Sequence, residues 1–254
     1  MTKRHEKLGI KQIIQKTWMD KTVQMMLAGL PEKEIRFELD EYLSTQKQSG
    51  GTGQRGETSY RMAISLLSSW FAPEKELRPF RDDALLLAKS LRADDWFPLH
   101  WAVLSASYPF WFNVARQTGR LLNLQDQTTR LQIFNRLKEQ YGDRETVSRN
   151  ARYTVRSFVA WGALKDSDAK GCYEKSTPWV ISDTNIGILL LESELLALPE
   201  GKGSLGALQK TPAFFPFQLP QMTGDFISQN NERIDVDRYG LDDEMLKLKV
   251  GCSV

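Results

Sequence analysis

Apolar residues recur at intervals of three or four through most of the chain, and this spacing predicts a mainly helical protein. Within residues 8–29, Ile10, Ile14 and Trp18 follow this spacing, so one helix or two shorter ones are expected there. Pro and Gly residues separate the later apolar runs and indicate where helices end. Further helices are expected over about 31–46, 58–71 and 80–92.

Residues 96–115 are rich in aromatic and aliphatic side chains, which raises the question of a membrane span. They contain Pro98, His100, Pro109 and Asn113, whereas a spanning helix needs about 20 residues that are almost all apolar. We therefore expect two buried helices that are divided at Pro109, and no membrane contact.

Two amphipathic helices are expected next, over 128–140 and 145–162. At about 100° per residue, Arg149, Arg152 and Arg156 lie within roughly 60° of one another on the second helix. Apolar residues cluster on its opposite side, namely Val147, Ala151, Val155 and Phe158. One side of this helix is thus suited to burial, and the other presents three guanidinium groups.

A β-hairpin is expected after the second helix. Residues 163–166 predict a short strand and 167–171 a turn, after which CYEKST and PWVIS, over 172–182, complete the hairpin. A helix, a tight turn, a longer helix and a hairpin follow one another in the second half of a winged helix-turn-helix. Residues 128–182 resemble such a unit.

The pattern changes after residue 182. A helix capped by Ser182 or Asp183 is expected to end before Pro199, and two or three short antiparallel strands are expected over 225–250. The sequence shows no internal repeat. The chain is therefore predicted to be mainly α with a small β part. Its expected divisions are a helical domain over 1–124, a winged-helix-like segment over 125–183, and a helix with a β-hairpin region over 184–254.

Charge is distributed unevenly along the chain, although the net charge is only +2. Residues 128–165 hold eight basic and three acidic side chains, and residues 1–16 hold five basic and one acidic. Local positive charge favours DNA because each neutralised phosphate releases counterions. The basic N-terminus is either a flexible arm that touches DNA or only a solubilising end. Residues 181–254 hold eleven acidic and six basic side chains and are better suited to a protein partner.

The chain lacks the usual signals of catalysis or cofactor binding. The two histidines, His5 and His100, and the two cysteines, Cys172 and Cys252, are too few and too scattered for a zinc site. The glycine-rich stretch 47–57 has no GK[ST] ending and is interpreted as a surface loop. We expect no cofactor and no enzymatic activity. Unpaired cysteines and a charged N-terminus without an apolar signal indicate a soluble cytoplasmic protein.

Two stretches carry a resemblance to a known family: GLPEKEIRFELDEYL over 29–43 and TVRSFVAWGALKD over 154–166. Together with the aromatic helical core, they resemble the BrxA-type accessory proteins of BREX phage-defence systems. The resemblance implies a small, helical, non-catalytic DNA-binding component that works beside larger enzymes.

The sequence therefore predicts a double-stranded-DNA-binding accessory or regulatory protein. The alternative is a non-catalytic adaptor subunit that binds proteins through the winged helix and the acidic C-terminal region. The residues expected to contact DNA are Arg144, Arg149, Arg152, Tyr153, Arg156, Lys165, Lys170 and Lys175.

Overall fold

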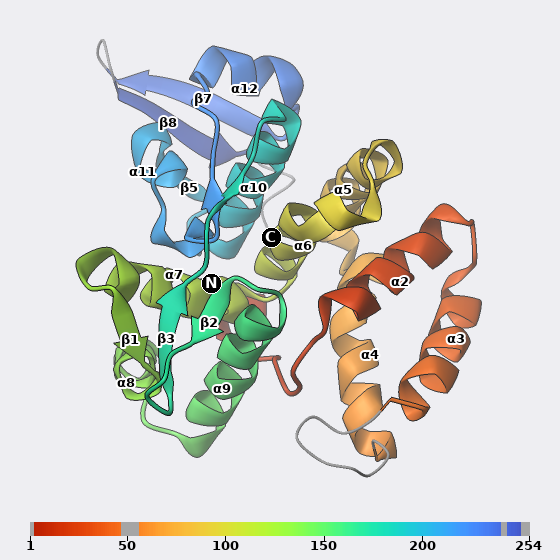
Figure 1. Cartoon of the computed structure of the whole chain (residues 1–254). Coiled ribbons are helices and arrows are strands. Elements are labelled where there is room, and N and C mark those ends of the chain that lie inside the picture. Colours follow the sequence, from red (N-terminus) through yellow and green to blue (C-terminus); the bar gives the residue numbers. More distant parts are fainter. Residues whose placement is uncertain (1–2, 47–55, 240–242, 250–254) are drawn as a thin grey trace.

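The computed structural model describes residues 3–46, 56–239 and 243–249, and its architecture is mainly α with small β-sheets, which confirms the predicted fold class (Figure 1). The helices of the first hundred residues surround a core that continues through both later parts of the chain. These helices are α1 (Lys3–Glu6), α2 (Lys16–Leu27), α3 (Glu32–Ser44), α4 (Glu57–Phe71), the short η1 (Lys75–Leu77), α5 (Arg78–Ser90) and the short η2 (Ala93–Trp96).

The helix predicted from residue 8 is wrong at its start, because residues 7–15 run without helical structure and α2 begins only at Lys16. Ile10 and Ile14 are buried as their spacing suggested, but the backbone of Ile14 is bound elsewhere. Its N–H donates to Ser157 Oγ at 3.0 Å, and its carbonyl accepts from the Trp161 indole at 2.8 Å. Tertiary hydrogen bonds thus replace the helical ones here.

The aromatic stretch forms two core helices, α6 (Phe97–Ser107) and α7 (Pro109–Leu124), divided at Pro109 as predicted. Trp101, Phe110 and Trp111 are completely buried, and Trp96 is nearly so. Edge-to-face contacts such as that between Trp101 and Trp111, at 5.5 Å between ring centroids, fill the centre. Over the described residues, no helix combines the length and the apolar character that a membrane crossing requires.

Residues Pro109–Lys175 form what we call the first module. After α7 come β1 (Gln127–Thr129), α8 (Arg130–Tyr141), α9 (Glu145–Ala160), β2 (Leu164–Asp166) and β3 (Cys172–Lys175). The strands form an antiparallel sheet in the order β1-β3-β2. Thr129 closes a capping box with Gln132 at the start of α8. The two helices and the hairpin expected over 128–175 are therefore present.

Residues Thr184–Leu248, the second module, repeat this order of elements. Helix α10 (Thr184–Ala197), capped by Asp183 as predicted, precedes β5 (Lys202–Ser204), α11 (Leu205–Gln209), α12 (Gly224–Asn230), β7 (Ile234–Tyr239) and β8 (Asp243–Leu248). The sheet order β5-β8-β7 matches β1-β3-β2 position by position, and all pairs are again antiparallel. The structure thus contains a repeat of topology that the sequence does not show.

An insertion in the second module joins the two modules. Between α11 and α12 lie η3 (Pro212–Phe214), which packs against α7, and β6 (Phe217–Gln218). Strand β6 pairs in parallel with β4 (Trp179–Val180), so PWVIS does not complete the hairpin as expected. The strand prediction is also wrong for residues 225–230, which belong to α12.

The backbone of the insertion passes directly against α7 at Gly119. A Cβ at Gly119 would lie 1.9 Å from the Pro212 carbonyl oxygen, whereas a Cβ at Gly206 on α11 would meet nothing within 4 Å. We expect Gly119→Ala to lower the free energy of unfolding by about 2–3 kcal/mol, because backbone must move to admit the methyl group. Gly206→Ala, the control, should raise it by about 0.5–1 kcal/mol. Urea denaturation measures both, and equal effects would contradict this packing.

Glu194 lies in α10 at the same junction and is 5% exposed. Burial raises its pKa from an ordinary value of 4.5 to about 8, and the Thr211 hydroxyl and the Arg116 charge lower it by less. The folded protein therefore prefers the neutral acid, and its stability should fall as the pH rises from about 4.5 to about 8.

Glu194→Gln keeps the shape of the side chain and removes the cost of ionisation. We expect the free energy of unfolding at pH 7 to rise by about 1–3 kcal/mol, and the decline between pH 5 and pH 8 to become shallower. The matched control is Glu232→Gln, since Glu232 is exposed. Denaturation at a series of pH values tests this, and a loss of stability in Glu194→Gln at pH 7 would show that the carboxylate is the form the fold needs.

Candidate nucleic-acid interface

Helix α9 presents one apolar and one cationic face. It follows a turn at Gly142, whose φ of +80° lies in the left-handed region that favours glycine. Val147, Ala151, Val155 and Phe158 are all completely buried, as the sequence predicts. Because this face is fixed in the core, the opposite face is held at the surface in a defined orientation.

Arg144, Arg149 and Arg152 are exposed along the first half of α9. Arg144 donates to the Tyr141 carbonyl at 3.1 Å, and Arg149 lies 3.6 Å from Glu145 in a pair that is open to solvent. The Arg152 guanidinium lies 5.4 Å from the ring centroid of Tyr153, which is half-buried. Exposed pairs of this kind contribute little energy, so the guanidinium groups can exchange partners with phosphate.

Arg156 departs from the prediction. Its Nη1 donates to both carboxylate oxygens of Asp166, at 2.6 and 2.8 Å, and this hydrogen bonding raises the pKa of Arg156. Helical geometry placed Arg156 on the cationic face correctly, but strand β2 returns alongside α9 and brings Asp166 to it. Arg156 therefore links the hairpin to α9, and it is not a free cation.

Two of the three lysines predicted to bind DNA lie on the exposed part of the hairpin. Lys165 and Lys170 are exposed, on β2 and in the turn. Lys175 pairs in register with Leu164 at the base of the hairpin, and its Nζ donates to Asn123 Oδ1 at 2.8 Å. Lys175 thus lies beside α7 at the base of the hairpin, away from the turn, and its contact with DNA stays a prediction.

Arg130 is a candidate that the sequence argument left out of its site. Its side chain is exposed at the first position of α8. Its backbone N–H donates to the Gly171 carbonyl at 2.8 Å, which places Arg130 beside the hairpin turn. Within the described ranges, eight basic side chains of the first module take part in no ion pair. Four of these are exposed on α8, α9 or the hairpin and have no side-chain hydrogen bond either: Arg130, Arg152, Lys165 and Lys170. The signal in the sequence was the position of Arg130 in the first turn of the helix expected over 128–140.

The basic N-terminal segment lies against α9 and is held in place through Ile14, so the expectation of a flexible arm is wrong for residues 7–15. Arg4 is 9% exposed and donates to the Leu196 carbonyl, and Lys16 is bound to Asp20 at 2.8 Å. Of this basic cluster, Lys7 and Lys11 line a surface groove next to Arg149.

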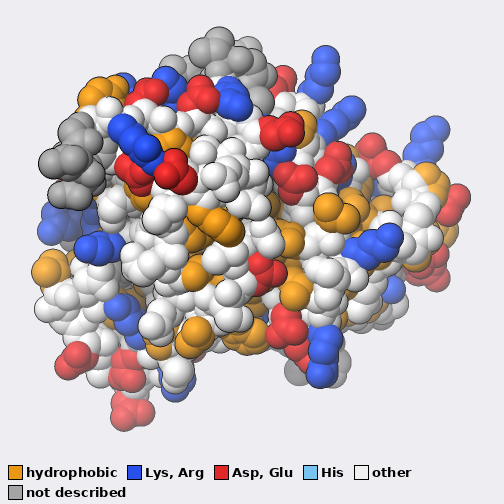
Figure 2. Space-filling model, turned by 90° about the horizontal axis from the view of Figure 1, so that it is seen from above, with side chains coloured by type: hydrophobic (Ala, Val, Ile, Leu, Met, Phe, Trp, Pro, Cys, Tyr) orange, Lys and Arg blue, Asp and Glu red, His pale blue; other side chains and the backbone are white. Residues whose placement is uncertain are grey.

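The corresponding surface of the second module is electrostatically balanced. Arg238 bridges Asp225 and Glu244, and Lys247 binds Asp237 at 2.7 Å. Figure 2 views the molecule from the side of β7 and β8 and shows acidic and basic side chains interspersed over that face. The two modules therefore share a topology but differ in available charge. Among the described residues, Arg238 and Lys247 of the second module have carboxylate partners, whereas Arg130, Arg152, Lys165 and Lys170 of the first have none.

His100 has the environment of a core residue. It is completely buried, its Nε2 lies 2.9 Å from Asp20, and its ring meets Trp70 edge to face. Burial lowers its pKa more than Asp20 raises it, so the imidazole is held neutral. Among the residues that the structure describes, no three His, Cys, Asp or Glu side chains are grouped as a metal site would need.

The chain was compared with models of protein families, with curated proteins and with solved structures. None of the three comparisons finds a match. The interpretation of the first module as a nucleic-acid interface therefore depends on its topology, its charge and its exposed residues.

Proposed function

We propose that this chain is a double-stranded-DNA-binding accessory or regulatory protein that uses α9 and the β2–β3 hairpin. The observation that carries the proposal is the exposed cationic face of α9, which is backed by a fully buried apolar face and flanked by a hairpin that exposes Lys165 and Lys170. A helix of this kind fits the major groove, while a hairpin beside it reaches the adjacent backbone.

The topology of the first module supports the same proposal. A strand, two helices and an antiparallel hairpin whose returning strand pairs with the first strand is the arrangement of a winged helix. In such units the early residues of the second helix approach the bases. Arg144 is the residue directly before α9, and Arg149 and Arg152 lie in its first half.

The proposed biological setting follows from the resemblance to BrxA-type proteins of BREX phage defence. In that setting the chain is cytoplasmic and non-catalytic, and it binds DNA beside other protein subunits of a defence complex. The alternative is an adaptor that binds proteins only, through the winged helix and the acidic C-terminal region, and the excess of acidic side chains over 181–254 favours a protein contact there.

The first test replaces Arg149 and Arg152 with alanine together. We expect the wild type to bind mixed-sequence duplex DNA at low salt, with affinity that falls steeply as salt rises. The double variant should weaken binding, and the log–log slope should become less negative by about 1.8, or 0.9 for each phosphate contact removed. The thermal midpoint should stay nearly constant because both side chains are exposed.

The matched control is Arg78→Ala with Lys89→Ala, which removes two exposed cations from α5. It should leave the affinity and the slope unchanged. Fluorescence anisotropy over a salt series measures both proteins. A folded wild type that fails to bind duplex DNA at low salt would favour the adaptor alternative instead.

A second test uses Asp166→Asn, which removes a carboxylate from the surface and releases Arg156. We expect tighter DNA binding and a slope that is more negative by up to about 0.9, since one guanidinium becomes available to phosphate. Asp168→Asn in the hairpin turn removes the same charge but releases no arginine. If both variants strengthen binding equally, Arg156 takes no part; if neither does, the hairpin lies away from the DNA.

A further inference from the structure

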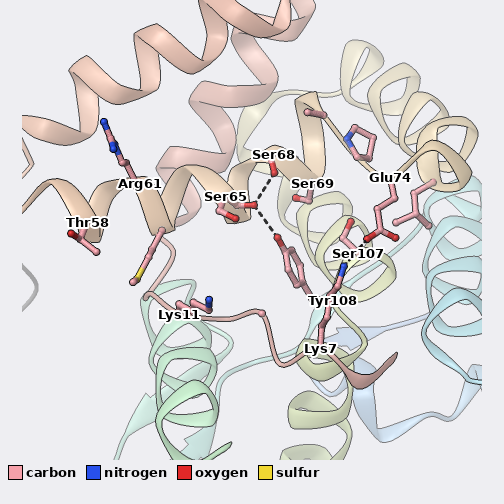
Figure 3. A pocket seen from close by; sticks show the side chains of 15 residues that line it. Lys7, Lys11, Thr58, Arg61, Ser65, Ser68, Ser69, Glu74, Ser107 and Tyr108 are labelled. Atoms are coloured by element: carbon pink, nitrogen blue, oxygen red, sulfur yellow. Dashed lines mark hydrogen bonds and ion pairs between the residues drawn. The ribbon is translucent and has the colours of Figure 1, made fainter. Parts of the chain in front are cut away.

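A surface groove runs along the N-terminal segment, on both sides of residues 7–11. The side next to α9 encloses about 740 Å³ and is lined by Lys7, Lys11, Met62, Thr146, Arg149 and Tyr153. The side next to α4 encloses about 630 Å³ and shares Lys7, Lys11 and Met62 with the first. Figure 3 shows this segment, which carries Lys7 and Lys11, passing alongside α4.

The groove has the lining expected for a phosphodiester chain. Lys7, Lys11 and Arg149 supply positive charge, and the neighbouring α4 supplies the hydroxyl groups of Thr58, Ser65 and Ser68. The acidic side chain on its lining is Glu74, which lies at the end near Lys7, 3.4 Å from its ammonium group. Both partners of that pair are at least half exposed, so phosphate can displace the carboxylate at little cost.

Two buried polar groups on the lining lack a partner within the described structure. Asn150 is 6% exposed and lies on the α9 side; its Oδ1 accepts no hydrogen bond. Ser69 is 4% exposed and lies on the α4 side; its Oγ is likewise unpaired. Buried polar groups in native proteins normally have a partner, so the groove holds bonding capacity that the chain itself does not use.

The segment that forms the middle of the groove is fixed in place. Gly9 has a φ of +72°, and a Cβ there would lie 2.5 Å from Cδ1 of Tyr108, so the backbone passes directly over this ring. The Tyr108 hydroxyl donates to the Ser65 carbonyl at 2.9 Å, which holds the ring against α4 (Figure 3). Ile10 and Ile14 are buried on either side of Lys11. The position of Lys11 is therefore set before any ligand binds.

We propose that this groove binds the phosphodiester backbone of the DNA that α9 contacts, and that Lys7 and Lys11 are its phosphate ligands. The inference rests on the proposed function. Arg149 connects the two sites, because it belongs both to the cationic face of α9 and to the lining of the groove. A strand that leaves α9 at Arg149 enters the groove that Lys7 and Lys11 line. The bound backbone belongs either to the continuing duplex or to an unpaired strand that extends from it.

The test compares three proteins on two probes: a blunt-ended duplex, and the same duplex with a single-stranded extension. In the variant Lys7→Ala with Lys11→Ala, we expect a salt-dependence slope that is less negative by about 1.8 if duplex DNA occupies the groove, or by about 1.4 if an unpaired strand does. Lys33→Ala with Lys89→Ala, on α3 and α5, removes the same charge from exposed positions elsewhere and should match the wild type. A change on both probes assigns the groove to duplex, and a change on the extended probe alone assigns it to an unpaired strand.

A further variant, Gly9→Ala, tests the groove without changing its charge. It forces the segment away from Tyr108 and should weaken binding severalfold while the lysines remain. If it unfolds the protein, the surface lysine variants still decide the question. Unchanged slopes in the lysine variant on both probes would overturn this inference, and loss of binding in Arg149→Ala with Arg152→Ala would then leave the proposed function standing. A wild type that binds neither probe would overturn both.

Discussion

The packing of Trp161 is the constraint on which the cationic surface depends. This side chain follows the last residue of α9, and its ring meets those of Phe97, Trp101 and Trp111 in the aromatic core. Its indole N–H binds the Ile14 carbonyl at 2.8 Å. One residue thus anchors the end of α9 to the core and holds the N-terminal segment along the same helix. The orientation of the basic face follows from these contacts.

The two modules show how one topology can serve different surfaces. Both place a helix and a hairpin on an antiparallel sheet with the same strand order. In the second module the helix at that position has seven residues, against sixteen in the first, and the nearby arginine and lysines are bound to carboxylates. These neighbouring carboxylates cancel the local positive charge that would attract a phosphate, so similarity of topology does not imply similarity of ligand.

Local patterns in the sequence predicted most elements of the first module. The alternation of apolar and charged residues in α9 defined its buried face, because that periodicity depends only on helical geometry. Contacts between segments far apart in the sequence could not be predicted, because local periodicity carries no information about them. Arg156 pairs with Asp166 because β2 runs back alongside α9. The hydrogen bond from the Ile14 N–H to Ser157 Oγ joins residues that are 143 positions apart. The repeat of topology was also hidden, since different side chains produce it in each module.

The insertion of the second module packs the two modules into one hydrophobic core, which their repeated topology alone does not require. Helix α10 packs along α6, and η3 rests on α7 where Gly119 leaves room for the Pro212 carbonyl. Each module therefore completes the hydrophobic core of the other. Repeated units linked by a flexible tether can turn independently and search separate targets. Here the shared core sets the angle between the two module surfaces, so a ligand that spanned both would have to fit that one angle.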